Sequence, residues 1–294
     1  MSFRQASPEL YRPLPIPIRP YTDETTRSYI RRINKANALQ HDELTKALQQ
    51  DRQPWFQNLA IWTDTDPEVL LLAMPQLAQY RPDPALRQKL VGRPIRTTHA
   101  SACHHCTLAR GAGPYVEVYS THERVICPHH GLWIGDGVGA TADQFSIGAC
   151  PEISEAWHHH KNLIARHGHA QVRRAFHISS VVNWGWYDQF QHFSAALDTY
   201  ETLTTNHPRQ ANSPALVAAA LYPSIIMLTA AIASPSWRYI ARSRHPEPFL
   251  NRVSSEVTEG WTPQGAFDPL RHWMETDWTA EFRGSDTILP PKRS

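Results

Sequence analysis

The chain has 294 residues, of which 41% are hydrophobic and 19% are charged. This balance excludes a disordered or fibrous protein, and the length allows one large or two ordinary domains. The formal net charge of +2 neither requires a nucleic-acid partner nor excludes one, because binding depends on where charges cluster rather than on their sum.

The N-terminal residues predict an extended segment followed by a helix. Four prolines between residues 13 and 20 favour an extended backbone over the first 21 residues. A helix is expected from about residue 22 to 37, with Thr22 or Asp23 as its cap and acidic side chains in its first turn. Tyr29 and Ile33 recur at helical spacing and predict its buried face.

This helix also carries four basic side chains, namely Arg27, Arg31, Arg32 and Lys35. They fall at positions i, i+4, i+5 and i+8, so the sequence predicts a basic face that could contact DNA. A solvated helix face explains the same pattern equally well. DNA contact by these residues is therefore a hypothesis at this point.

Three short amphipathic segments follow, at residues 41–50, 54–62 and 66–77. Closely connected segments of this kind form either helix-turn-helix units or a plain helical bundle. The stretch 81–96 is punctuated by proline and glycine, which indicates a domain junction.

These patterns predict a mainly α protein in three parts. We expect an N-terminal helical domain with helix-turn-helix-like units over residues 1–96, a small zinc ribbon with a β-hairpin over residues 97–150, and a helical C-terminal domain over residues 151–294. The start of the chain shows no apolar core of a secretion signal, so we expect a cytoplasmic protein.

Two pairs of metal-ligand residues stand 20 residues apart in the predicted ribbon. Cys103 and Cys106 form a CxxC pair, and Cys127 and His130 form a CxxH pair. Zinc prefers four tetrahedral thiolate or imidazole ligands, which two such pairs supply. The alternation around Val116–Ile126 indicates strands, and we expect short hairpins to present both pairs.

The neighbouring histidines and the fourth cysteine fit this set less well. His104 and His105 lie inside the first pair, and His129 stands one position too early to repeat its spacing. His122 is predicted to be a surface residue, and Cys150 a buried free thiol.

The predicted site has structural rather than catalytic character. Four protein ligands leave no open position for substrate or water, as a catalytic zinc would need. The sequence contains no H-E-x-x-H, G-x-S-x-G or phosphate-loop motif. We therefore expect one structural Zn²⁺ ion and a protein that is not an enzyme.

The C-terminal half predicts further helices. One begins near Pro151 and ends at Gly168, and it opens a second cationic region that could contact DNA. Four basic residues define this region, namely Lys161, Arg166, Arg173 and Arg174. No clear period emerges over residues 244–294.

The apolar run 215–233 is nearly long enough to cross a bilayer. Pro223 divides it, and alanine dominates its first half. We therefore expect two short buried helices separated at this proline rather than a membrane span.

Three features in order resemble the TniQ family of target-selection adaptors, which transposons with a AAA+ ATPase regulator encode. They are the proline-rich start and helix with Ser28, Tyr29, Arg32 and Asn37, the segment "LLLAMPQL", and the finger "CHHC…VICPHHG", over about residues 14–135. The resemblance implies zinc-ligand roles for the same two cysteine-containing pairs. It also implies a non-enzymatic adaptor in DNA transposition, with DNA and a AAA+ ATPase as partners.

Two other functions are compatible with the residues. One is a stand-alone DNA-binding regulator with helix-turn-helix and zinc-ribbon parts, which would bind DNA without any ATPase. The other is a protein-interaction scaffold without transposition activity.

Overall fold

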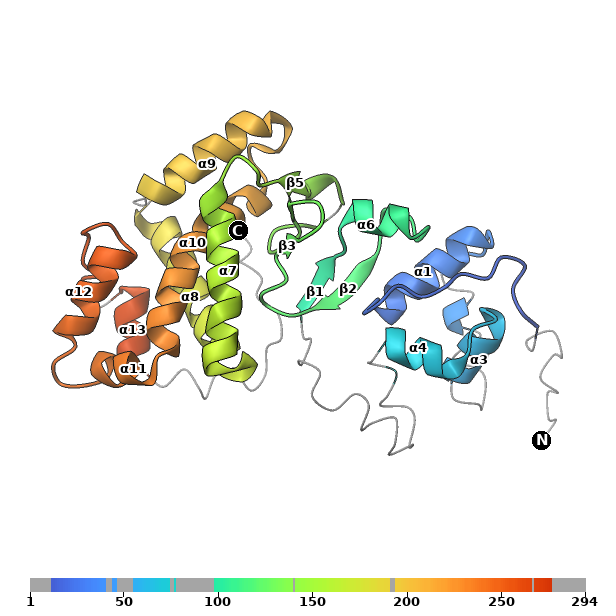
Figure 1. The fold of residues 1–294 in the computed structure, drawn as a ribbon, viewed down its shortest axis with the longest axis horizontal. Helices are drawn as coiled ribbons and strands as arrows, with labels where there is room; N and C mark the ends of the chain where they lie inside the picture. Colours follow the sequence, from blue (N-terminus) through green and yellow to red (C-terminus); the bar gives the residue numbers. More distant parts are fainter. Residues whose placement is uncertain are drawn as a thin grey trace. The chain divides into compact units, whose positions relative to one another are not determined.

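A computed structural model describes residues 12–40, 44–46, 55–74, 77, 98–139, 141–190, 194–265 and 267–276 (Figure 1). The structure is mainly helical with small antiparallel sheets in the middle of the chain, which confirms the predicted fold class. It divides into two compact units, residues 1–120 and 121–294. The three-part division expected from the sequence stays a prediction. The expected junction at 81–96 and most of the segment 41–50 lie outside the described residues.

The helices of the first unit are α1 (Thr26–Ala36), α3 (Trp55–Trp62) and α4 (Pro67–Ala73). Each is too short to be stable alone, so packing must hold it. A cluster of fully buried side chains provides that packing, with Tyr29 from α1, Leu59 from α3 and Leu70 from α4.

The cap of the first helix lies two or three residues later than the sequence suggested. Thr25 is its cap and accepts a hydrogen bond from the backbone N–H of Ser28, and the first turn contains no acidic residue. The cap predicted at Thr22 or Asp23 was wrong because this part of the backbone is already paired elsewhere. The N–H of Tyr119 donates to the carbonyl of Asp23, and the N–H of Thr25 donates to that of Glu117.

Two strands complete the described part of the first unit. Strand β1 (Thr98–Ser101) pairs antiparallel with β2 (Glu117–Ser120), and the short helix α6 (His104–Ala109) lies in the loop that joins them. The alternating segment does form strands, as predicted. It pairs backward with β1, so it is not one hairpin within Val116–Ile126 as expected.

The second unit begins with a separate three-stranded antiparallel sheet, in the order β3 (Ile126–Cys127), β4 (Leu132–Trp133) and β5 (Phe145–Ser146). A 3₁₀ turn, η3 (Thr141–Asp143), precedes β5. Trp133 and Phe145 are buried in one hydrophobic cluster with residues of the helices that follow. These two-residue strands are thus held by the helical core rather than by their own ladder.

The rest of the second unit is helical. Its elements are α7 (Pro151–His167), α8 (His169–Phe190), α9 (Ser194–Asn206), η4 (Pro208–Gln210), α10 (Pro214–Ala233), α11 (Pro235–Ala241), α12 (Glu247–Glu256) and α13 (Pro269–Glu275). Gly168 ends α7 with φ 79°, a conformation that glycine adopts without strain, as the sequence predicted. Helices α12 and α13 lie where no period was apparent, because each spans only two or three turns.

The apolar run forms one continuous helix, α10, rather than the two helices expected. It packs against α7, α8 and α9 (Figure 1), and 14 of its 20 residues are buried. Pro223 removes one backbone hydrogen bond, at a typical cost of about 3 kcal/mol. We attribute the continuity of the helix to burial on all sides, which outweighs that cost.

Helix α10 is long and apolar enough to cross a membrane by length and composition, and 72% of its most apolar window is buried inside the protein. The core helix of a globular unit meets the same criterion, because a helix that is apolar all round is normally buried. The finding is therefore weak evidence for a membrane span.

If α10 is a core helix, the change Leu228→Ala should destabilise the second unit strongly. Leu228 is 0% exposed, and the cavity left by such a truncation typically costs about 2–5 kcal/mol. Leu197→Ala on α9 is the matched control, since Leu197 is 41% exposed and should cost less than about 1 kcal/mol. Urea unfolding followed by circular dichroism measures both. Equal losses would contradict the burial of α10.

Candidate metal centre

A buried carboxylate fixes the strands that flank the first cysteine pair. Glu24 is 0% exposed and accepts hydrogen bonds from the N–H of Tyr21 at 2.9 Å, from Ser28 Oγ at 2.9 Å and from Arg32 Nη1 at 2.5 Å. Ser28 Oγ in turn accepts from the N–H of Glu117 on β2 at 3.0 Å. Helix α1 is thereby attached to the strand pair.

The environment of Glu24 balances two opposing effects. Burial raises the pKa of its carboxyl above the usual range, and the charge of Arg32 and the hydrogen bonds that the carboxyl accepts offset only part of this rise. A buried carboxylate without such partners would be strongly destabilising. Arg32 is thus committed to a structural ion pair, with only 10% of its side chain exposed.

The other basic residues of α1 lie differently. Arg31 forms an ion pair with Glu117 at 3.0 Å and keeps 39% of its side chain exposed. Arg27 and Lys35 are exposed. Arg27, Arg31 and Lys35 of the predicted basic face therefore point outward at successive turns. Arg32, the fourth member, points to the buried carboxylate of Glu24.

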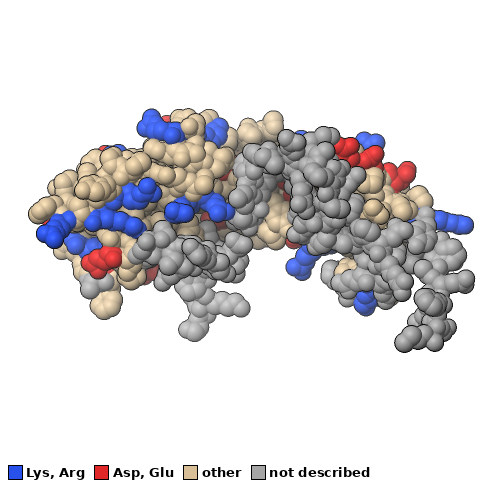
Figure 2. Space-filling model, turned by 90° about the horizontal axis from the view of Figure 1, so that it is seen from below, with Lys and Arg blue, Asp and Glu red and all other residues tan. Residues whose placement is uncertain are grey.

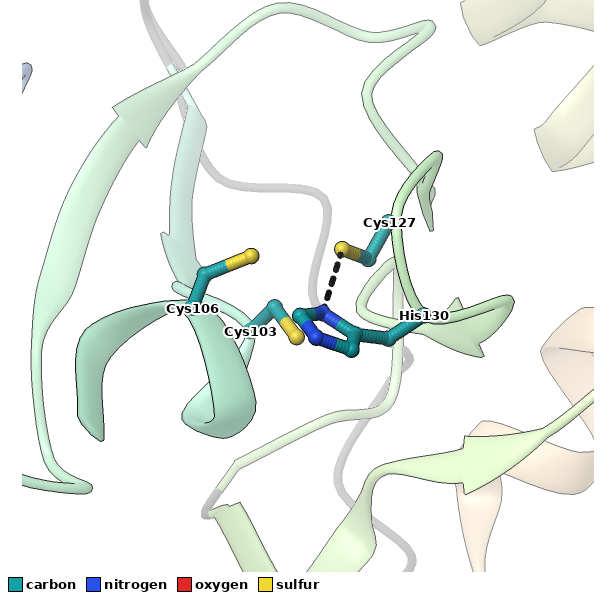
Figure 3. Close-up of side chains that lie close together, drawn as sticks. All are labelled: Cys103, Cys106, Cys127 and His130. Carbon is teal, nitrogen blue, oxygen red and sulfur yellow. Dashed lines mark hydrogen bonds between the residues drawn. The ribbon is translucent and has the colours of Figure 1, made fainter. Parts of the chain in front are cut away.

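The four predicted metal ligands converge (Figure 3). The sulfur atoms of Cys103, Cys106 and Cys127 and a ring nitrogen of His130 all lie within 4.8 Å of one another. Cys127 Sγ and His130 Nδ1 are 3.6 Å apart. Cys103 and Cys127 are buried, Cys106 is half-buried and His130 is exposed.

Local structure explains why each pair points to one place. Cys103 precedes α6 and Cys106 lies within it, so the two side chains, three residues apart, lie on one side of the helix. This differs from the expected hairpin knuckle. The second pair does lie in a tight turn between β3 and β4. There Gly131 adopts φ 58°, a conformation that glycine adopts without strain, and donates its N–H to the carbonyl of Cys127.

The donor set fits a structural zinc ion. Three thiolates and one imidazole are a common tetrahedral zinc set, with Zn–S distances of about 2.3 Å and Zn–N distances of about 2.0 Å. Ligand atoms already this close together need only small shifts to reach such distances. These four residues are thus close enough to hold one metal ion.

The other candidates near the pairs lie outside this set. His105 and His129 are exposed, and His104 is half-buried with its ring 4.0 Å from that of His105. Cys150 is buried at the start of α7, as predicted for a free thiol. Burial, with Glu152 nearby, raises the pKa of its thiol to about 11, so it is not a reactive thiolate at neutral pH.

His122 is not the surface residue that the sequence suggested, because its side chain is only 8% exposed. Its Nδ1 lies 2.8 Å from Nε2 of His160, whose own Nδ1 lies 2.8 Å from the hydroxyl of Tyr222 on α10. Burial lowers the pKa of His122 to about 4 and that of His160 to about 2. Both imidazoles are therefore neutral at neutral pH.

Sequence reasoning missed this buried chain of polar side chains. The run of three histidines on α7 contained a signal, because successive helical residues point about 100° apart and only one of the three can face the core. His160 is that residue, at 0% exposed, while His158 is exposed. Tyr222 within the apolar run was the second signal, since a buried tyrosine hydroxyl usually has a partner.

If the four-residue cluster binds zinc, Cys106→Ala should lower the metal content by about one ion per chain, because three ligands hold zinc far less tightly than four. His105→Ala is the matched control in the same helix and should retain the metal. Metal analysis of the purified proteins measures both. Equal zinc in the two variants would contradict the ligand set.

Comparison with known proteins agrees with this geometry. No curated protein and no solved structure shows significant similarity to the chain. Residues 15–133 match the family model TniQ, a range that includes α1, its proline-rich approach and all four clustered ligands. Residues 15–133 of this chain are therefore a TniQ domain, which confirms the family resemblance found in the sequence.

Proposed function

We propose that the protein is a non-enzymatic, zinc-containing adaptor of the TniQ type that acts in DNA transposition. It would help to select target sites by linking DNA, or a partner bound to DNA, to a AAA+ transposition regulator. The observation that carries the proposal is the family match over residues 15–133 together with the convergence of Cys103, Cys106, Cys127 and His130 inside it. A cytoplasmic location follows from this role.

The zinc ion would act on structure rather than on chemistry. Four protein donors complete a tetrahedral shell, so the ion has no open position at which to activate water. Its binding energy would hold α6 and the β3–β4 turn in their folded geometry, because the ligands do not converge in an unfolded chain.

The first surface proposed for DNA is the outer face of α1. Arg27 and Lys35 are exposed, and Arg31 is partly exposed beside Glu117. We give Arg32 no direct role in DNA contact, since moving it to a phosphate would leave Glu24 buried without its cation. In this proposal α1 is part of a helix-turn-helix unit.

The second surface proposed for DNA lies on the second unit. Figure 2 shows Lys and Arg side chains spread over one face of it, with few acidic side chains among them. Arg166, Arg173 and Arg174 are exposed on α7 and α8, and the exposed Lys161 places its Nζ 3.7 Å from the centre of the Trp157 ring.

Helix α11 and the turn after it add arginines that sequence reasoning missed, although Arg242 also lies 5.4 Å from the centre of the Trp273 ring. Arg238, Arg242 and Arg244 line a shallow hollow with the exposed Tyr239. The start of α8 lies beside the end of α10, where Gln171 donates to the carbonyl of Ala233, so α11 continues from the same region. Arginine and an exposed aromatic ring are typical contacts for a nucleic-acid backbone and base.

If the second surface binds DNA, the double change Arg166→Gln and Arg174→Gln should weaken binding to duplex DNA of any sequence. The slope of log K against log salt should fall by roughly 2, because each lost phosphate contact removes about 0.9. Arg252→Gln is the control, since Arg252 pairs with Glu256 on α12 at 2.9 Å. A double variant with the slope of this control would exclude Arg166 and Arg174 as phosphate contacts.

The adaptor role makes a separate prediction about the protein partner. The full chain, immobilised on DNA, should retain a AAA+ ATPase from the same transposon, and DNA without the chain should not. If the chain binds DNA with a strong salt dependence but does not retain the ATPase, the result would favour the stand-alone regulator instead. If the chain binds neither DNA nor the ATPase, the protein-interaction scaffold would be the function that remains.

A further inference from the structure

A second group of metal-ligand side chains lies apart from the cysteines. One ligand atom each from His122, Glu123 and His169 lies within 4.8 Å of the other two. His122 and Glu123 belong to the turn before β3, and His169 is the first residue of α8. All three belong to the second unit, and nothing in the TniQ match assigns them a role.

Two polar atoms in this group are buried without a hydrogen-bond partner. They are Nε2 of His122 and Oε2 of Glu123, which face each other at 3.9 Å. Neither atom makes a hydrogen bond of normal geometry, although the backbone of His169 lies close enough to the His122 ring to interact with it. Their side chains are 8% and 19% exposed. Most buried polar atoms in proteins are hydrogen-bonded, so a pair of unpartnered atoms aimed at one point needs a physical explanation.

The polar atoms of Glu123 and His122 that face away from the proposed ion make hydrogen bonds within the protein, as those of metal ligands usually do. Thr121 Oγ1 donates to Oε1 of Glu123 at 2.6 Å, which leaves Oε2 as the free oxygen. Nδ1 of His122 is hydrogen-bonded to His160, which is hydrogen-bonded to Tyr222. With a proton on His122 Nδ1, its Nε2 carries a lone pair that points at Glu123, and outer partners of this kind orient metal-ligating histidines.

We propose that His122 Nε2, Glu123 Oε2 and the ring of His169 bind a second divalent metal ion, with zinc as the best fit. Two imidazoles and one carboxylate are a recurrent three-residue zinc set that leaves a fourth position for water. The ion would provide the partner that both buried atoms need. It would also connect the turn before β3 to the start of α8.

The ion must be accommodated beside a positive charge. Arg173 lies one turn along α8 from His169 and is near enough to affect His122 electrostatically. Arg173 is exposed, so its charge is screened by water, while the carboxylate of Glu123 lies directly in the proposed ligand set. The local balance of charge therefore still permits a cation.

Metal counting on the full chain tests the proposal. After chelation and refilling with zinc, the unaltered protein should bind about two ions, one in each group. His169→Ala should bind about one fewer and keep the cysteine site. His158→Ala, an exposed histidine of α7, is the matched control and should keep both. Glu123→Gln keeps the shape of the side chain and should weaken the second ion by at least about tenfold.

Cobalt substitution separates the two sites. Thiolate ligands give Co²⁺ an intense near-ultraviolet charge-transfer band, whereas a site of nitrogen and oxygen ligands lacks it. His169→Ala should therefore remove one Co²⁺ ion and leave that band intact, while Cys106→Ala should abolish the band and leave the second ion. If the unaltered protein binds one ion that His169→Ala does not affect, His122 and Glu123 form an ion pair without metal and the proposal is wrong. That outcome would leave the adaptor role unaffected.

Discussion

The strands in the middle of the chain are too short to be stable by themselves. β1 and β2 have four residues each, and β3, β4 and β5 have two each. Isolated strand pairs of this size are at best marginal in water, so each sheet must be held by something else. In the first unit the backbone at Glu24 bridges to Val118 and its carboxylate binds Ser28 and Arg32 of α1. In the second unit burial against helices has the same effect.

This constraint gives the family motif a physical meaning. Tyr29 donates its hydroxyl to the carbonyl of Ile18 at 2.6 Å, and Asn37 exchanges two hydrogen bonds with the backbone of Ile16. Together with the contacts of Ser28 and Arg32, these bonds attach the proline-rich approach and β2 to α1. The approach needs such partners because prolines remove backbone donors. The motif residues thus build the domain, whereas Arg27 and Lys35 beside them stay exposed.

The sequence predicted what depends on local spacing and missed what depends on long-range packing. The cysteine-containing pairs could be found because each is one turn of backbone. His122, His160 and His169 could not, since 9 to 47 residues separate them along the chain and only the packing of α7 and α8 brings them together. The continuity of α10 through Pro223 was missed for the same reason. Its neighbours, rather than its own residues, decide that the helix continues.

Arginine content alone is a poor guide to DNA binding in this chain. Of the 29 basic residues, 24 are arginine, but several are used within the fold. Arg32 neutralises a buried carboxylate, Arg110 lies 5.1 Å from the centre of the Tyr21 ring, and Arg252 lies 4.7 Å from that of Trp237. Such contacts commit the guanidinium to packing, because its planar face covers an aromatic ring. Arg242, although exposed, lies 5.4 Å from the centre of the Trp273 ring in the same way. Local exposure and the contacts of each side chain, rather than net charge, therefore decide where a phosphate could reach an arginine of this chain.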